Sequence, residues 1–259
     1  MAEETNRELR MNARAVFDFT GTRVLITGGT SGIGHATAVL FRNAGADVTI
    51  TGTRSSQGGY QTDLSGMSYA QLVLTDPASI DALKERFDAL DVLINNAGAN
   101  FPGGLDESAP DGFDASVALN LNGTYRLTVA MRRALKASTA PGGAAVVNLS
   151  SMSALRAVTL VPGYSAAKAG IIALTRTLAV KWAKDGIRVN VVAPGTIDTP
   201  MTAPMQGIPA LIDSEVALIP LGRFGRAEEI APTIAFLCTE HSSYTTGALF
   251  VVDGASDCF

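Results

Sequence analysis

A short apolar run followed by closely spaced glycines restricts most strongly what this chain can fold into. Residues 23–28 are predicted to form a buried strand and residues 32–44 a helix. Gly28, Gly32 and Gly34 lie in the turn, where a backbone can approach a pyrophosphate and a helix N-terminus faces negative charge. Because strand, turn and helix occur in this order, we predict a dinucleotide site rather than glycines that serve packing alone.

Strands and helices alternate through the rest of the chain. Further strands are predicted at residues 47–51, 70–74, 91–95, 144–151, 187–194 and 248–252, and helices at residues 77–90, 111–138, 163–184 and 227–238. Asp76 is expected to cap the first of these helices. This alternation predicts a single α/β domain with a doubly wound, mostly parallel sheet of about seven strands and helices on both faces.

Three segments lie outside this pattern. Residues 1–20 are polar and are predicted to be an N-terminal extension to a domain at residues 21–259. Residues 55–68 are rich in Gly and Ser, so the crossover there is expected to be short or irregular. Residues 199–221 are rich in Met, Pro and Leu, which suits a mobile lid over an apolar pocket.

Composition excludes several classes of function. Only 17% of residues are charged and the net charge is -4, so no basic surface for nucleic acid is expected. No apolar run is long enough for a membrane span, and the N-terminus lacks the apolar core of a signal peptide. Cys238, Cys258, His35 and His241 are isolated, so we expect a cytoplasmic protein without a metal site.

The residues after the second strand bear on the choice of cofactor. An acid there would hold the ribose 2′-hydroxyl of NAD, whereas an arginine accommodates the 2′-phosphate of NADP. Gly52 and Thr53 provide no acid, and Arg54 follows them. We therefore predict NADP, with NAD left open because Arg54 could also be a solvent-facing loop residue.

Small polar residues close two other buried strands. Asn95, Asn96, Ala97 and Gly98 end one of them, where ligands gather in parallel sheets, although two adjacent asparagines are also typical of a plain turn. Ser150 and Ser151 end the next strand.

Tyr164 and Lys168 are the candidate chemical pair. They are four residues apart in a predicted helix, so their side chains share a face. An ammonium beside a phenol favours the phenolate and lowers the phenol pKa, which suits general acid/base catalysis. On its own, such a pair is more simply explained as surface residues of an amphipathic helix. A catalytic interpretation therefore depends on the other motifs.

Taken together, the motifs have an order and spacing that resembles the short-chain dehydrogenase/reductase family. They comprise residues 27–34, residues 95–98, Asn120, Ser151, residues 164–168 and Pro194-Gly195. The resemblance covers residues 22–254. It implies a Rossmann-type domain, a nicotinamide cofactor, no catalytic metal and a homotetramer or homodimer.

The resemblance also implies catalytic roles. Tyr164 would exchange a proton with the substrate oxygen, and Lys168 would lower its pKa and bind the nicotinamide ribose. Ser151, thirteen residues before Tyr164, would orient the substrate oxygen, with Ser150 as the alternative. Asn120 would hold a water that links Lys168 to solvent.

Cofactor contacts follow from the same resemblance. Asn96 would pack on the adenine ribose side, Gly98 would allow close approach, and Ile197 and Thr199 would meet the nicotinamide carboxamide. The full predicted set is Gly28, Thr30, Ser31, Gly32, Ile33, Gly34, Thr53, Arg54, Asn96, Ala97, Gly98, Tyr164, Lys168, Pro194, Gly195, Ile197 and Thr199.

Some positions depart from the family pattern. Val73 replaces an acid that contacts adenine in many members, and Ser31 replaces a base common in NADP-preferring ones. The last predicted strand runs into Asp253-Gly254-Ala255 rather than Asp-Gly-Gly, and Phe259 is expected to pack against a neighbouring subunit.

The expected function is interconversion of a secondary alcohol and a ketone of small size by NAD(P)-dependent hydride transfer. Residues 220–231 resemble both 3-oxoacyl carrier-protein reductases and sugar or polyol dehydrogenases. Asp185 lies at the position, just before the glycine that ends the helix, where carrier-protein reductases tend to have a basic residue. A cofactor-binding regulatory protein is the alternative. An epimerase or dehydratase is disfavoured because those enzymes usually need a longer C-terminal domain.

Overall fold

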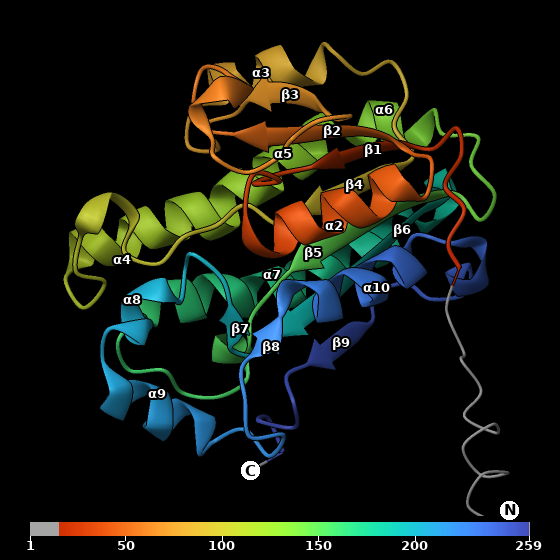
Figure 1. Cartoon of the computed structure of the whole chain (residues 1–259). Coiled ribbons are helices and arrows are strands. Elements are labelled where there is room, and N and C mark those ends of the chain that lie inside the picture. Colours follow the sequence, from red (N-terminus) through yellow and green to blue (C-terminus); the bar gives the residue numbers. More distant parts are fainter. Residues whose placement is uncertain (1–15, 259) are drawn as a thin grey trace, which may run out of the picture.

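The computed structural model describes residues 16–258, in which seven parallel strands form one sheet (Figure 1). The spatial order is β3-β2-β1-β4-β5-β6-β9. The strands are β1 (Arg23–Ile26), β2 (Asp47–Gly52), β3 (Ser68–Gln71), β4 (Val92–Asn95), β5 (Ala144–Leu149), β6 (Ile187–Pro194) and β9 (Leu249–Val252). The predicted doubly wound parallel sheet is confirmed.

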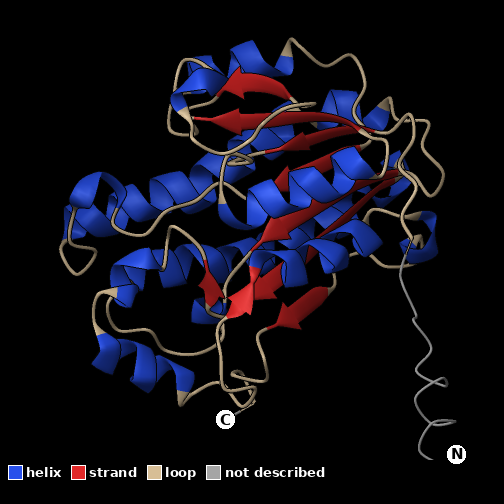
Figure 2. Ribbon diagram, viewed as in Figure 1, coloured by secondary structure: helices blue, strands red, loops and turns tan. Residues whose placement is uncertain are grey.

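Helices cover both faces of the sheet (Figure 2). Because successive strand residues point to opposite faces, Ile26 packs in one apolar cluster and Leu25 in the other. Phe41 and Ile234 join the first cluster, whereas Trp182 joins the second. The first face is covered by α2 (Gly32–Asn43) and α10 (Ala227–Leu237), and the second by α3 (Pro77–Lys84), α5 (Thr124–Ala130), α6 (Arg132–Lys136) and α7 (Pro162–Trp182).

The strand order reverses beside β1, which pairs with β2 on one side and with β4 on the other. Chains that leave β1 and β4 therefore diverge, and a crevice for ligands forms at the carboxyl ends of such strands. Figure 1 shows α4 (Pro110–Val117), α8 (Ala203–Gln206) and α9 (Pro209–Val216) beyond these strand ends. The predicted lid segment thus contains two short helices.

The prediction for the third strand is wrong in its boundaries. The strand runs from Ser68 to Gln71, rather than over residues 70–74, because Gln71 pairs with Gly52 at the end of β2. The irregular crossover is confirmed as a single 3₁₀ turn at Gln57–Gly59. Asp76 caps α3 as expected, since its carboxylate accepts a hydrogen bond from the Ala78 amide.

The prediction of one continuous helix at residues 111–138 is also wrong. A π-helical segment at Ala118–Gly123 separates α4 from α5, and α6 follows as a further short helix. A Cβ on Gly123 would lie 2.8 Å from the Leu74 carbonyl oxygen, so this segment packs closely against the backbone of the turn between β3 and α3. Such segments often mark functional sites, and this one contains Asn120.

The ends of the domain are partly described. Phe19 lies within the predicted extension, yet it is buried and its ring centroid is 4.5 Å from that of Phe41. Residues 1–15 and Phe259 lie outside the described residues, and with them the expected contact of Phe259. Within residues 16–258 no helix is both long and apolar enough to cross a membrane.

Arg188 joins the beginning of β6 to the end of α10. Its buried guanidinium donates hydrogen bonds to the carbonyl oxygens of Leu237 (2.9 Å), Ser242 (3.1 Å) and Gly142 (3.2 Å). Leu237 and Ser242 are buried, so their carbonyls have little access to water and depend on the arginine for partners.

We expect Arg188→Met to lower the free energy of unfolding by about 2–4 kcal/mol, because it leaves the buried carbonyls of Leu237 and Ser242 without this donor. Chemical denaturation monitored by circular dichroism measures this change. Arg133→Met, at an exposed position on α6, serves as the control and should change stability by less than about 0.5 kcal/mol.

Candidate active site

The glycines after β1 allow three segments to approach one another. A Cβ on Gly34 would lie 2.3 Å from the Gly28 carbonyl oxygen, and one on Gly28 would lie 3.0 Å from the Ala97 Cα. Gly32 has a left-handed φ of 52°, and its Cβ would lie 3.2 Å from the Thr199 side chain. Gly28 and Gly34 therefore serve close packing, whereas Gly32 faces Thr199, the first residue of the predicted lid segment.

Asn96 holds the glycine-rich turn in place. Its Nδ2 donates to the carbonyl oxygens of Thr27 (3.0 Å) and Gly28 (3.1 Å). In return, the Thr27 hydroxyl accepts hydrogen bonds from the Asn96 and Ala97 amides. The side-chain amide of Asn96 is thus engaged by the turn, and it joins the end of β4 to the end of β1.

The N-terminus of α2 lacks acidic side chains. Ser31 occupies its N-cap without a side-chain capping bond, and the first turn contains no acid. The positive end of the helix dipole therefore has no internal counter-charge, and it can accept the charge of a pyrophosphate. Together with the crevice beside β1, this shows that the residues present fit a dinucleotide.

Tyr164 and Lys168 lie one turn apart near the beginning of α7, and both are buried. The Lys168 Nζ lies 5.4 Å from the centre of the Tyr164 ring and donates a 2.7 Å hydrogen bond to the Leu149 carbonyl oxygen. A Cβ on Gly98 would lie 3.4 Å from this Nζ and 2.6 Å from the Asn120 Oδ1. The fold thus brings together four elements that the sequence motifs placed far apart.

Burial dominates the electrostatics of the pair. Desolvation raises the pKa of Tyr164 to about 12, although a hydrogen bond with Ser151 acts in the opposite direction. The nearby Glu107 carboxylate also raises the pKa of Tyr164. The expected lowering of this pKa by Lys168 is therefore wrong for the protein alone, because removal of the phenolate from water has the larger effect. Desolvation likewise lowers the pKa of Lys168 to about 8.

The two serines after β5 have different partners. The buried Ser150 hydroxyl donates a 2.8 Å hydrogen bond to the Lys168 carbonyl oxygen, so it fixes α7 against the sheet. Ser151 is partly exposed, and its hydroxyl accepts from the Ser153 amide and forms a hydrogen bond with Tyr164. The geometry therefore supports Ser151 rather than Ser150 as the residue that meets a substrate.

Asn120 is fully buried within the π-helical segment. Its Nδ2 donates to the carbonyl oxygens of Ala99 (2.9 Å) and Ser116 (3.0 Å), and its Oδ1 accepts from the Ala99 amide (3.1 Å). Asn120 therefore fixes the loop after β4 beside Lys168. Its part in a proton relay stays a prediction.

Arg54 belongs to an aromatic cluster after β2. Its guanidinium lies 4.9 Å from the centre of the Tyr60 ring, and its amide donates a 3.0 Å hydrogen bond to the Tyr60 hydroxyl. The Tyr69 hydroxyl donates to the Arg54 carbonyl oxygen. A Cβ on Gly52 would lie 2.2 Å from the Tyr60 hydroxyl oxygen, so this cluster occupies the space that an acid at Gly52 would need.

The remaining predicted residues lie around the same strand ends. A Cβ on Gly195 would lie 2.7 Å from the Asp253 Cα, so this glycine packs against the end of β9. Ile197 is buried, and its carbonyl oxygen accepts from the Thr202 hydroxyl. Buried or backbone-bonded positions are also found for Thr30, Ile33, Thr53 and Pro194.

An ion pair connects the loop between β5 and α7 to α9, in the predicted lid segment. The Arg156 guanidinium donates to the Glu215 carboxylate of α9, which also accepts a 2.6 Å hydrogen bond from the Thr196 hydroxyl. The Nε of Arg156 is buried without a partner. These residues, like Glu107, were not predicted from sequence. The only hint was that Arg156 is the one charged residue between Ser151 and Tyr164.

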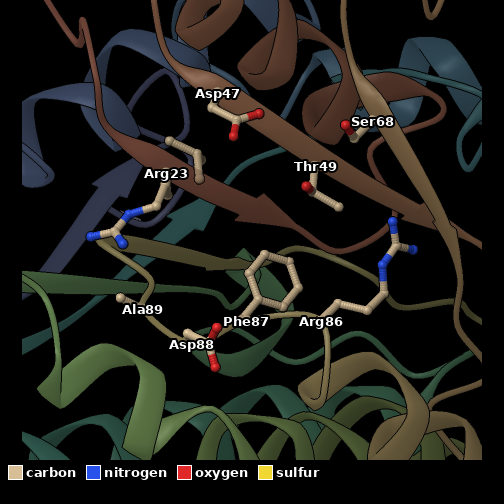
Figure 3. A pocket seen from close by; sticks show the side chains of 9 residues that line it. Arg23, Asp47, Thr49, Ser68, Arg86, Phe87, Asp88 and Ala89 are labelled. Carbon is tan, nitrogen blue, oxygen red and sulfur yellow. The ribbon is translucent and has the colours of Figure 1, made fainter.

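A separate hollow of about 290 Å³ lies at the amino ends of β1 to β3 (Figure 3). Arg23 and Arg86 stand on opposite sides of it with Phe87 between them. Arg23 is already paired with Asp91 at 2.9 Å. Because the hollow lies at the amino ends of the strands, whereas Tyr164 lies near their carboxyl ends, the hollow is not part of the candidate active site.

A sequence model of a protein family, described as enoyl-(acyl carrier protein) reductase, matches residues 28–255. A cis-4-hydroxycyclohexanecarboxylate dehydrogenase from Sinomonas cyclohexanicum is 38% identical, with 89% of this chain and 94% of that protein covered. The 3-oxoacyl-(acyl-carrier-protein) reductase FabG of Salmonella typhimurium is 35% identical, with 91% of this chain and 97% of that protein covered.

A solved structure is similar over nearly the whole chain. It is described as a putative 2-deoxy-D-gluconate 3-dehydrogenase from Agrobacterium tumefaciens with bound NADP. Its TM-score is 0.80 and its identity 31%, with 95% of this chain and 100% of that chain covered.

We expect Ser151→Ala to lower kcat at least about 100-fold, because the hydroxyl beside Tyr164 is lost. Ser150→Ala should instead lower the melting temperature and keep kcat within about tenfold, because it removes a bond to the backbone of α7. Steady-state kinetics and thermal unfolding of both variants check this. The reverse pattern would assign the substrate contact to Ser150.

Proposed function

The chain belongs to the short-chain dehydrogenase/reductase family of nicotinamide-dependent oxidoreductases, and from this we propose which of its residues act in the reaction. Tyr164 exchanges a proton with the substrate oxygen, and Ser151 orients that oxygen by a hydrogen bond. Lys168 and Asn120 hold the site together from α7 and the π-helical segment. The observation that carries the proposal is that these four residues form one series of contacts. Asn120 and Lys168 both lie next to Gly98, Lys168 lies over the Tyr164 ring, and Tyr164 forms a hydrogen bond with Ser151.

The bound nicotinamide supplies or accepts the hydride at the substrate carbon. In reduction, the protein must deliver a proton to the carbonyl oxygen as the carbon receives the hydride. Tyr164 is protonated at neutral pH because burial raises its pKa to about 12, so it can act as that donor. In oxidation, the phenolate oxygen of ionised Tyr164 takes the proton from the alcohol. The ammonium of Lys168 is largely charged at pH 7, since its pKa is about 8.

We expect Tyr164→Phe to reduce turnover at least about 100-fold and to change the Kd of the reduced cofactor by less than about threefold, because only the proton donor is removed. Coupled absorbance assays with a panel of ketones and secondary alcohols, together with cofactor fluorescence titrations, measure both quantities. Unchanged turnover would exclude Tyr164 as acid/base. Cofactor binding without turnover of any substrate by the native protein would favour the regulatory alternative.

NADP is the proposed preferred cofactor. Arg54 supports this, because its exposed guanidinium is held over Tyr60 at the end of β2. Gly52 and Thr53 are the positions where an NAD-binding carboxylate would be expected, and a side chain at Gly52 would clash with the Tyr60 hydroxyl in this arrangement. The similar structure with bound NADP is consistent with this preference.

We expect the native protein to bind NADPH at least tenfold more tightly than NADH, which corresponds to about 1.4 kcal/mol. Arg54→Ala should remove most of this difference by weakening NADPH alone, since only that cofactor carries the 2′-phosphate. Fluorescence titration gives both Kd values, with Arg133→Ala on the surface of α6 as the control. Equal losses for both cofactors would contradict a 2′-phosphate contact.

The proposed substrate is a free secondary alcohol or ketone of small size, as in sugar and polyol dehydrogenases. Two similar proteins are named for hydroxylated carboxylates. The alternative is a 3-oxoacyl group on an acidic carrier protein. Against it, Asp185 forms ion pairs with Arg132 and Lys136, which neutralises the basic side chains beside α7.

We also propose a cytoplasmic homodimer or homotetramer with residues 199–221 as the substrate lid. Tyr125 and Val180 are exposed on α5 and α7, beside an apolar hollow lined by Leu121 and Leu174. This face supports pairing with a second copy. Cys238 and Cys258 are both free, as is usual for a reducing compartment.

A further inference from the structure

Glu107 is a fully buried carboxylate in the loop before α4, with an exposed fraction of 1%. Its Oε2 accepts a 2.6 Å hydrogen bond from the Tyr164 backbone amide. Its Oε1 accepts a 2.9 Å hydrogen bond from the Phe101 amide. One side chain therefore joins the loop after β4 to the first turn of the helix that carries Tyr164.

The first turn of α7 needs such a partner. The initial amides of a helix have no acceptor within the helix, and a capping side chain normally supplies one. Val161 occupies the N-cap and provides no side-chain capping bond, and Pro162 has no amide hydrogen. Glu107 supplies the missing acceptor from 57 residues away. Its negative charge also lies at the positive end of the helix dipole.

The second arm of Glu107 fixes a strained loop. Phe101 has a φ of 48°, which is a left-handed conformation that non-glycine residues adopt at a cost in free energy. This loop begins with Gly98 and Ala99, which pack against Asn120 and Lys168. The bond to Glu107 therefore helps to hold the loop that forms one wall of the catalytic site.

Close backbone packing holds the loop that carries Glu107 in a fixed position relative to α4 and α7. A Cβ on Gly112 would lie 2.0 Å from the Asp106 carbonyl oxygen, and a Cβ on Gly163 would lie 3.0 Å from the Phe113 Cα. Both glycines thus allow α4, α7 and the loop before α4 to touch through their backbones. In this arrangement the position of the carboxylate sets the position of the Tyr164 amide.

We propose that Glu107 is a positioning residue for Tyr164, which holds the first turn of α7 against the loop after β4 and places a negative charge beside the phenol. This charge raises the pKa of Tyr164 and so favours the protonated, proton-donating form. The other groups that face the phenol are the Lys168 ammonium from α7 and the Ser151 hydroxyl from the segment after β5. The inference rests on the proposed acid/base role of Tyr164.

The test compares pH profiles of kcat/KM for native protein and Glu107→Gln in both reaction directions. Gln keeps the length of the side chain but removes its charge, so the pKa of Tyr164 should fall. Its Nε2 cannot accept a hydrogen bond, so Gln also loses one of the two amide bonds and kcat should fall as well. In reduction, activity requires the protonated phenol, so kcat/KM falls as pH rises. In the Gln variant this fall should occur about 0.5–1 pH unit lower than in the native protein. In oxidation, activity requires the phenolate and appears as pH rises, so this rise should move in the same direction.

Two further variants separate charge from reach. Glu107→Asp keeps the charge but is one methylene too short to hold both amides, so kcat should fall about tenfold while the pH profile stays nearly native. Asp114→Asn removes an exposed acid from α4 and controls for net charge, and it should leave both properties unchanged. If the Gln variant does not fold, native kcat in the Asp variant would still overturn the proposal.

The outcomes distinguish this inference from the proposed function. If Tyr164→Phe retains activity, the acid/base role itself fails. If Tyr164→Phe loses activity but Glu107→Gln keeps the native pH profile and kcat, only the role of Glu107 fails. A profile shifted to lower pH in Glu107→Gln, with the native profile in Asp114→Asn, supports the positioning role.

Discussion

Burial of two ionisable side chains next to each other is the constraint on which the rest of the site depends. Tyr164 and Lys168 are both removed from water. Desolvation raises the pKa of Tyr164 and lowers that of Lys168, so it favours the neutral form of each. Such groups persist in a core only when their polar atoms have partners. Leu149 supplies one for the ammonium and Ser151 supplies one for the phenol. The neighbouring strands and loops can therefore be understood as the groups that make this burial possible.

The sheet order determines which segments can serve in this way. Strands β1, β4, β5 and β6 are neighbours and run parallel. Their carboxyl ends therefore lie on the same side of the sheet, and Asn95, Leu149 and Pro194 are the last residues of β4, β5 and β6. The glycine-rich turn and α2 occupy this side, with Asn96 bonded across to the turn. A cofactor bound at the turn and a substrate bound at Tyr164 would thus share one crevice.

Local features of the fold could be predicted from sequence, whereas long-range ones could not. The strand, turn and α2 were predicted correctly because apolar runs and glycines act within a few residues, as does the Asp76 cap. The break at Ala118–Gly123 depends on the contacts of Asn120 and Gly123 with distant backbone, which no local pattern shows. The role of Glu107 was missed for the same reason. The direction of the Tyr164 pKa was mistaken because burial, not the visible lysine, has the largest effect.

If burial controls the phenol, Tyr164 stays protonated in the protein until well above neutral pH and can donate a proton. The most direct test is an ultraviolet titration of tyrosinate in the native protein minus the same titration of Tyr164→Phe. The difference isolates one phenol among the five tyrosines of the chain. We expect no tyrosinate in the difference spectrum below about pH 10. Ionisation of Tyr164 below about pH 9 would contradict this expectation and would show that Lys168 controls the phenol instead.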